Sequence, residues 1–130
     1  MKIVRIYGMA QTVIPVKIVN GKEYRVFVND SERGHTPHFH FQIGSNPGKD
    51  KFKPDFESCI SLTDAEYSKE HKVQKVTADD AQWLDTMFRR RHHKYDCTNW
   101  EFACYLWNNS LSNREYEFDA QPDYTQLYTI

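Results

Sequence analysis

Apolar and polar residues alternate along much of the first half of the chain, and this pattern predicts β-strands. Val, Ile, Tyr and Phe are frequent there, as is typical of strands. The predicted strands cover residues 2–7, 12–19 and 24–30, then a segment from His38, and finally Phe56 to Leu62. Asn20-Gly21, between the second and third of these segments, is a strong signal for a tight hairpin turn. Residues 1–62 are therefore expected to be mostly strands.

Alternation within the strand that begins at His38 divides its side chains between two faces. His38 and His40 point one way, while Phe39 and Phe41 point the other. We expect the aromatic side chains to lie in the core. The histidines are then expected on the opposite face, in contact with water.

The periodicity changes to that of helices in the second half of the chain. Thr77 is a predicted N-cap, and Asp79 and Asp80 would follow in the first turn, where the helix dipole favours negative charge. Residues at helical spacing then form one face, apolar except for its last member: Ala81, Leu84, Met87, Phe88 and Arg91. These features predict a first helix that begins after Thr77.

A second helix is predicted from the spacing of Thr98 and Glu101, which matches a capping box, and it extends to about Asn109. Residues 77–110 are thus expected to hold two helices. Residues 112–130 mix charged and aromatic residues and are expected to form an extended tail. Strands followed by helices indicate a single α+β domain over residues 1–130, with a mainly antiparallel sheet packed by two helices.

Composition narrows the class of protein. A chain of 130 residues with 39% hydrophobic residues is long enough for one domain with its own core. A formal net charge of −1 argues against a protein that coats nucleic acid or is steered to a membrane. No apolar run is as long as a membrane span, and three cysteines without paired spacing are typical of reduced thiols. We expect a soluble, cytoplasmic protein.

Three histidines within six residues, His35, His38 and His40, form the strongest candidate site. Residues two apart on a strand lie about 6.6 Å apart on the same face, so two imidazoles can reach one ion. A turn would bring the third, and these three are the predicted metal ligands for zinc or iron. A carboxylate or a thiol on the same face could complete the set, and the candidates are Asp30, Glu32, Glu57 and Cys59.

The same three histidines also support readings without a metal. As general acid and base they could act on a phosphodiester, with arginine stabilising the charge. The side chains that could bind phosphate are Arg33 and a basic run with Arg89, Arg90, Arg91 and Lys94. The plainer interpretation of that run is that cations at a helix C-terminus complement the helix dipole. The plainer interpretation of the histidines is purely structural.

The segment Tyr24 to Asp30, followed by Gly34-His35-Thr36-Pro37-His38-Phe39-His40-Phe41, resembles the small bacterial domain-of-unknown-function family four-one-six-zero. Its members carry an H-x-P-P-H-x-H stretch, in which Thr36 here replaces one proline. Asn99-Trp100-Glu101 and the tail Pro122-Asp123-Tyr124-Thr125 are similar to a longer Bacteroides-type subgroup. The resemblance covers about residues 24–125.

This resemblance implies a genetic setting rather than a chemistry. Such proteins are often encoded beside another small protein, which suggests a toxin–antitoxin or mobile-element context and a neighbouring-gene product as partner. Three functions remain open on the sequence. The first is a nuclease or phosphoesterase that depends on the histidines or on a metal, and the second is a non-enzymatic protein-binding module. The third is a metal-binding structural domain.

Overall fold

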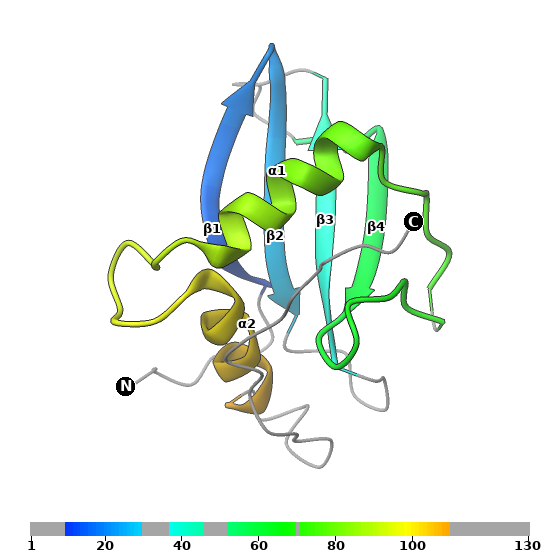
Figure 1. Cartoon of the computed structure of the whole chain (residues 1–130). Helices are drawn as coiled ribbons and strands as arrows, with labels where there is room; N and C mark the ends of the chain where they lie inside the picture. The colour runs from blue at the N-terminus through cyan, green and yellow to red at the C-terminus, as the bar shows by residue number, and fades with distance from the viewer. Residues whose placement is uncertain (1–9, 30–36, 46–51, 70, 110–130) are drawn as a thin grey trace.

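The computed structural model describes residues 10–29, 37–45, 52–69 and 71–109, which form one antiparallel sheet and two helices (Figure 1). The sheet has four strands in the order β1-β2-β3-β4. The strands are β1 (Ala10–Val19), β2 (Lys22–Asn29), β3 (His38–Gly44) and β4 (Phe56–Ser61), and the helices are α1 (Ala78–Arg89) and α2 (Asn99–Asn108). The predicted α+β class and antiparallel sheet are confirmed.

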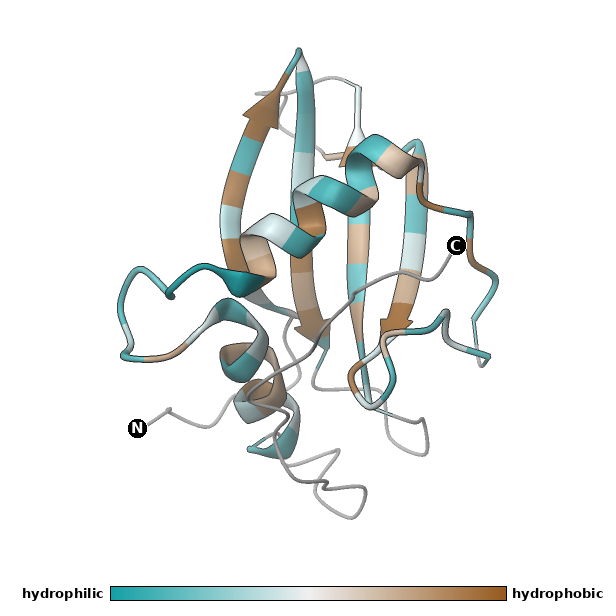
Figure 2. Ribbon diagram, viewed as in Figure 1, coloured by the Kyte–Doolittle hydropathy of each residue, from teal (hydrophilic) through white to brown (hydrophobic). Residues whose placement is uncertain are grey.

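The hairpin between β1 and β2 turns at the predicted dipeptide. Asn20 and Gly21 both have positive φ, 50° and 75°, as a tight hairpin turn requires. Each strand then pairs antiparallel with the next, and the register of β1 against β2 shifts on both sides of Ile14. Hydrophobic and hydrophilic residues alternate along the strands (Figure 2), so the two faces of the sheet differ in polarity.

Helix α1 lies across one face of the sheet and closes the aromatic core (Figure 1). The ring of Phe88 packs 4.7 Å from that of Phe39, and Trp83 stacks over Phe41 at 6.1 Å. Tyr24 reaches the start of the helix, where its hydroxyl donates a 2.7 Å hydrogen bond to Asp80. Burial and this carboxylate raise the pKa of Tyr24 to about 12. The aromatic set predicted for the core therefore packs against α1.

Helix α2 begins with the predicted capping box. The Thr98 hydroxyl accepts from the Glu101 N–H, and the Glu101 carboxylate accepts from the Thr98 N–H. The helix lies at one end of the sheet, beside β1 and β2 (Figure 1). Its Trp100 packs edge-on against Phe39 and Phe88 in the core. Helix α2 therefore covers the end of the core that α1 does not cover.

The connection between the helices departs from the predicted periodicity. Helix α1 ends at Arg89, and Arg90 is extended. Arg91, predicted to continue the helical face, instead forms an isolated bridge with Thr98, and the next N–H, that of His92, donates to the Cys97 carbonyl at 2.7 Å. The prediction for Arg91 was wrong because this local pairing replaces another helical turn.

Two predicted elements, the strand at residues 2–7 and the tail at 112–130, lie outside the described residues. Neither helix in the described part of the chain is long and apolar enough to cross a membrane. The cytoplasmic location remains a prediction.

Candidate metal centre

The face of the sheet opposite α1 carries a ladder of polar side chains across β3 and β4. Antiparallel pairing sets these residues opposite one another. Its pairs are His38 with Ser61, His40 with Cys59, and Gln42 with Glu57. The last pair is joined by a 2.6 Å hydrogen bond from the Gln42 amide to the Glu57 carboxylate. Sequence alternation had predicted His38 and His40 on this face.

The expectation that these histidines contact water was wrong. His38 is 1% exposed, His40 5% and Cys59 1%. The His38 ring packs 5.2 Å from Trp107 of α2, and His40 is stacked on Phe27 of β2 at 5.0 Å with the planes 6° apart. Aromatic rings from two other elements therefore bury the imidazoles and hold their orientations.

His71 joins the cluster from an irregular segment beside β4. This segment is fastened to β4 by two backbone hydrogen bonds, from Ser68 N to the Cys59 carbonyl and from Gln74 N to the Glu57 carbonyl. The two donors are six positions apart, whereas their acceptors are only two apart. The chain between the donors therefore has more residues than regular pairing with β4 would need. The His71 ring lies against the rings of His38 and His40 on β3.

Four potential ligands meet in this place: His38, His40, Cys59 and His71. Their ligand atoms, one from each residue, all lie within 4.8 Å of one another. Cys59 Sγ and His40 Nδ1 lie 3.1 Å apart. The three imidazole centroids lie between 4.9 and 5.4 Å apart. Three imidazoles and a thiol at these distances could hold one metal ion.

A carboxylate lies just beyond this cluster. Glu57 Oε1 is 3.9 Å from His40 Nδ1, and the other oxygen of Glu57 accepts from Gln42. This Nδ1 is the His40 nitrogen that also contacts Cys59 Sγ, whereas a carboxylate that orients a metal-bound imidazole accepts from the other ring nitrogen. Glu57 was one of the possible ligands inferred from the sequence, and the structure places it beside the four convergent atoms rather than among them.

The structure brings together two of the three predicted histidines, His38 and His40. His35 and Arg33 lie outside the described residues. Cys59, inferred as a possible fourth ligand, lies on the face that its strand parity predicts, and the register of β4 against β3 sets it opposite His40. His71 was missed, because it is a single histidine in a charged segment without helical or strand periodicity. Its one signal was its position shortly after a strand that carries a candidate ligand.

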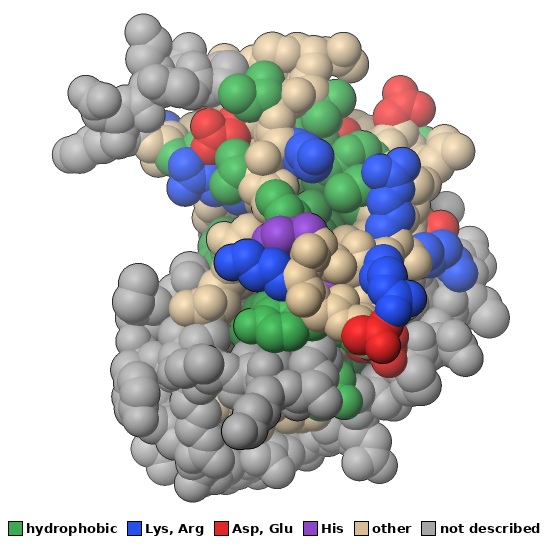
Figure 3. Space-filling model, turned by 90° about the vertical axis from the view of Figure 1, so that its left-hand side faces the viewer, with side chains coloured by type: hydrophobic (Ala, Val, Ile, Leu, Met, Phe, Trp, Pro, Cys, Tyr) green, Lys and Arg blue, Asp and Glu red, His purple; other side chains and the backbone are tan. Residues whose placement is uncertain are grey.

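The basic run lies elsewhere. Arg89 ends α1, and Arg90, Arg91 and Lys94 lie in the connection to α2, on the far side of the sheet from β4 (Figure 1). Arg89 pairs with Asp85 at 3.1 Å, and Arg91 forms an ion pair with Asp96. On the side of the molecule shown in Figure 3, basic side chains are interspersed with hydrophobic, polar and acidic ones. The structure therefore does not bring this run to the histidine cluster, and its phosphate binding remains a prediction.

Comparisons with known proteins leave the cluster to be interpreted from its own geometry. No family model, curated protein or solved structure matches the chain. The resemblance inferred from the histidine stretch remains a prediction. The chemistry of the four side chains is consequently the main guide to function.

Proposed function

We propose that this protein binds a zinc ion through His38, His40, Cys59 and His71, and that the ion serves to hold the domain together. One observation carries the proposal: four side chains from β3, β4 and the segment after β4 place their ligand atoms within 4.8 Å of one another. Residues so far apart in sequence converge on this point only in the folded chain.

The distances between the donor atoms are compatible with a tetrahedral ion. Zinc–nitrogen bonds of about 2.1 Å and a zinc–sulfur bond of about 2.3 Å place the four donors about 3.3 to 3.6 Å apart. The Cys59–His40 distance is already close to this range at 3.1 Å, and the others, all within 4.8 Å, need shifts of about 1 Å. Side-chain rotation can supply such shifts without moving the strands.

The donor set favours zinc over iron. Imidazole and thiolate together are the usual ligands of tetrahedral zinc, whereas mononuclear ferrous sites commonly combine two histidines with a carboxylate. Here the fourth donor is the sulfur of Cys59, and the nearby Glu57 stands outside the set. Iron is therefore the second choice.

Four protein ligands also indicate a structural rather than a catalytic ion. A catalytic zinc keeps a coordination position for water or substrate, whereas a structural zinc is closed by the protein. Three of the four ligands are buried here. The ion would fasten the His71 segment to the sheet, so its binding free energy would add to the stability of the fold.

Cobalt substitution tests this proposal directly. Tetrahedral Co²⁺ gives intense visible bands, and a thiolate ligand adds a charge-transfer band in the near ultraviolet. We expect protein from which a chelator has removed the metal to develop both kinds of band at one equivalent of Co²⁺. Both should disappear when Zn²⁺ is added. Cys59→Ser should remove the charge-transfer band, although the thiols of Cys97 and Cys104 remain. His93→Gln, an exposed histidine outside the cluster, is the matched control and should behave as wild type.

Three results would contradict the proposal. The first is a weak spectrum typical of octahedral cobalt, which would mean that water rather than protein supplies the ligands. The second is a charge-transfer band that persists in Cys59→Ser. The third is binding that is equally weakened in His93→Gln and His71→Gln, because that would indicate binding by histidines in general.

The 3.1 Å contact between Cys59 and His40 also suits a thiol nucleophile with its base. Cys59 is only 1% exposed, however, so a substrate would not reach the sulfur without a change in the fold. A histidine-dependent phosphoesterase, in a toxin–antitoxin setting or not, would need one ligand to leave the ion. His71 is the natural candidate because it lies outside regular secondary structure.

A further inference from the structure

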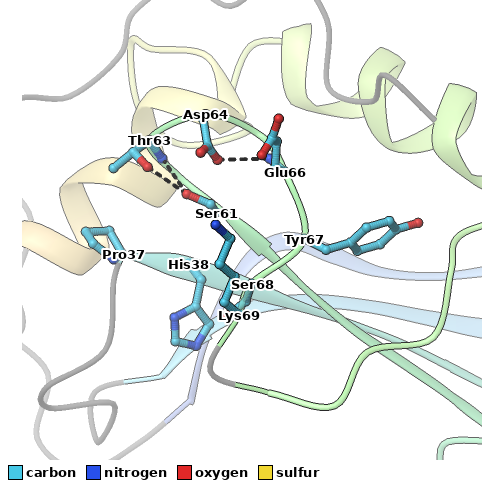
Figure 4. Close-up of a pocket in the computed structure, with 9 residues that line it drawn as sticks. All are labelled: Pro37, His38, Ser61, Thr63, Asp64, Glu66, Tyr67, Ser68 and Lys69. Atoms are coloured by element: carbon cyan, nitrogen blue, oxygen red, sulfur yellow. Dashed lines mark hydrogen bonds between the residues drawn. The ribbon is translucent and has the colours of Figure 1, made fainter.

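A small cavity lies beside the histidine cluster and shares one side chain with it. Its volume is about 200 Å³, and His38 forms part of its wall (Figure 4). The remaining lining residues come from Pro37 and from the end of β4 with the turn and segment that follow: Ser61, Thr63, Asp64, Glu66, Tyr67, Ser68 and Lys69. This volume is below the 300 to 1,000 Å³ typical of sites for drug-sized ligands, so an occupant would be small.

The polar groups of the cavity include both charges and several hydroxyls. Lys69 supplies a cation, and Asp64 and Glu66 supply two carboxylates. Ser61 and Thr63 add hydroxyls that are hydrogen-bonded to each other at 2.7 Å. In Figure 4 the Tyr67 ring points away from these groups, and its hydroxyl accepts from the Val76 N–H at 2.7 Å instead. The polar contacts with a ligand would therefore come from the charged side chains and the Ser61 and Thr63 hydroxyls, and not from Tyr67.

The turn that carries the charged rim is held in place by the backbone. Ser61 N donates to the Glu66 carbonyl at 2.7 Å, and Ala65 N donates to the Ser61 carbonyl at 3.0 Å. Ala65 has a φ of 59°, a conformation that is unfavourable for a residue with a Cβ. The Asp64 carboxylate accepts from the Glu66 N–H at 3.0 Å, which orients its side chain. The rim is thus preorganised, which lowers the entropy lost when a ligand binds.

We infer that this cavity binds a small zwitterion, a molecule with one ammonium and one carboxylate group such as a free amino acid. The ligand carboxylate would accept from Lys69 and from one hydroxyl of the Ser61–Thr63 pair, since the other hydroxyl donates within the pair. The ammonium would donate to Asp64 and Glu66. The site is distinct from the proposed metal centre, and only His38 belongs to both.

Charge complementarity selects this ligand class over others. A simple anion could pair with Lys69 but would be repelled by the two carboxylates, and a simple cation could pair with the carboxylates but would be repelled by Lys69. A divalent metal ion would likewise be repelled by Lys69, and among the described residues Asp64 and Glu66 are the only carboxylates that line the cavity. A zwitterion satisfies both signs at once.

Calorimetry with the common α-amino acids tests the inference on the full chain. We expect saturable one-to-one binding of at least one of them. Analogues of that amino acid without the amine or without the carboxylate should bind with an affinity at least about tenfold lower, because each loses a charge-assisted hydrogen bond. Lys69→Met should weaken binding by a similar factor, whereas Lys72→Met, an exposed lysine outside the cavity, should not. Asp64→Asn keeps an oxygen for the Glu66 N–H and tests the second charge.

Several outcomes would overturn the inference. One is the absence of saturable binding by any amino acid; another is an analogue without the amine or without the carboxylate that binds as tightly as the amino acid itself. A third is equal loss of affinity in Lys69→Met and Lys72→Met. Removing metal with a chelator should leave the affinity unchanged. If the affinity disappears with the metal while circular dichroism shows that the fold is retained, the ligand binds the ion rather than the cavity. Amino-acid binding in a protein that takes up no zinc would contradict the metal proposal and leave this one standing.

Discussion

Removal of zinc should lower the melting temperature of this protein strongly and in proportion to the logarithm of the free zinc concentration. An ion bound only by the folded state stabilises it by RT ln(1 + [L]/Kd), or about 4 kcal/mol when free zinc is about 1,000 times the dissociation constant. The four ligands come from β3, β4 and the segment containing His71, so the unfolded chain does not present this site. The full linkage term is therefore expected.

The shift can be estimated from the size of the chain. The unfolding entropy of a domain of 130 residues makes each kcal/mol worth about 4 °C in melting temperature. A stabilisation of about 4 kcal/mol thus raises the melting temperature by about 15 °C. His71→Gln, which removes one ligand, should weaken zinc binding at least about 100-fold and leave about 5 °C of that shift at the same zinc concentration.

Thermal unfolding followed by circular dichroism, over a series of buffered zinc concentrations, measures this directly. His93→Gln should show the shift of the wild type, because that exposed side chain lies in the connection between the helices and outside the cluster. The reasoning is refuted if the melting temperature does not depend on zinc. It is equally refuted if His71→Gln and His93→Gln show the same dependence.

Two further predictions concern the connection between the helices and the start of α2. Burial, with the nearby charges of His93 and Lys94, lowers the pKa of His92, whose Nδ1 accepts from the N–H groups of Lys94 and Tyr95. The unfolded chain then binds the proton more readily, so stability should fall as the pH drops below about 6.5. Chemical denaturation of metal-free protein should show a smaller loss in His92→Gln than in wild type. Thr98→Ala removes the capping box of α2 and should lower the free energy of unfolding by about 1 kcal/mol, measured at neutral pH.

The features predicted well from the sequence are those set by local chemistry. The turn at Asn20-Gly21 follows from positive φ, and the start of α2 at Thr98 follows from side chains that cap nearby N–H groups. The alternation of side chains along a strand is also local, and it predicted that Cys59 and His40 share one face of the sheet. The burial of that face could not be predicted, because it depends on where Trp107 and other distant rings pack. His71 escaped for a related reason, since only tertiary structure brings it to β3.

The surplus length of chain between Ser68 and Gln74 has a kinetic consequence. Because these two residues are anchored separately to β4, we expect that His71 can leave the cluster while the pairings of the sheet stay intact. Such local openings require far less free energy than global unfolding. The rate at which a bound ion exchanges would then be set by the rate of this local opening. The protein could therefore have a high melting temperature and still exchange its metal rapidly.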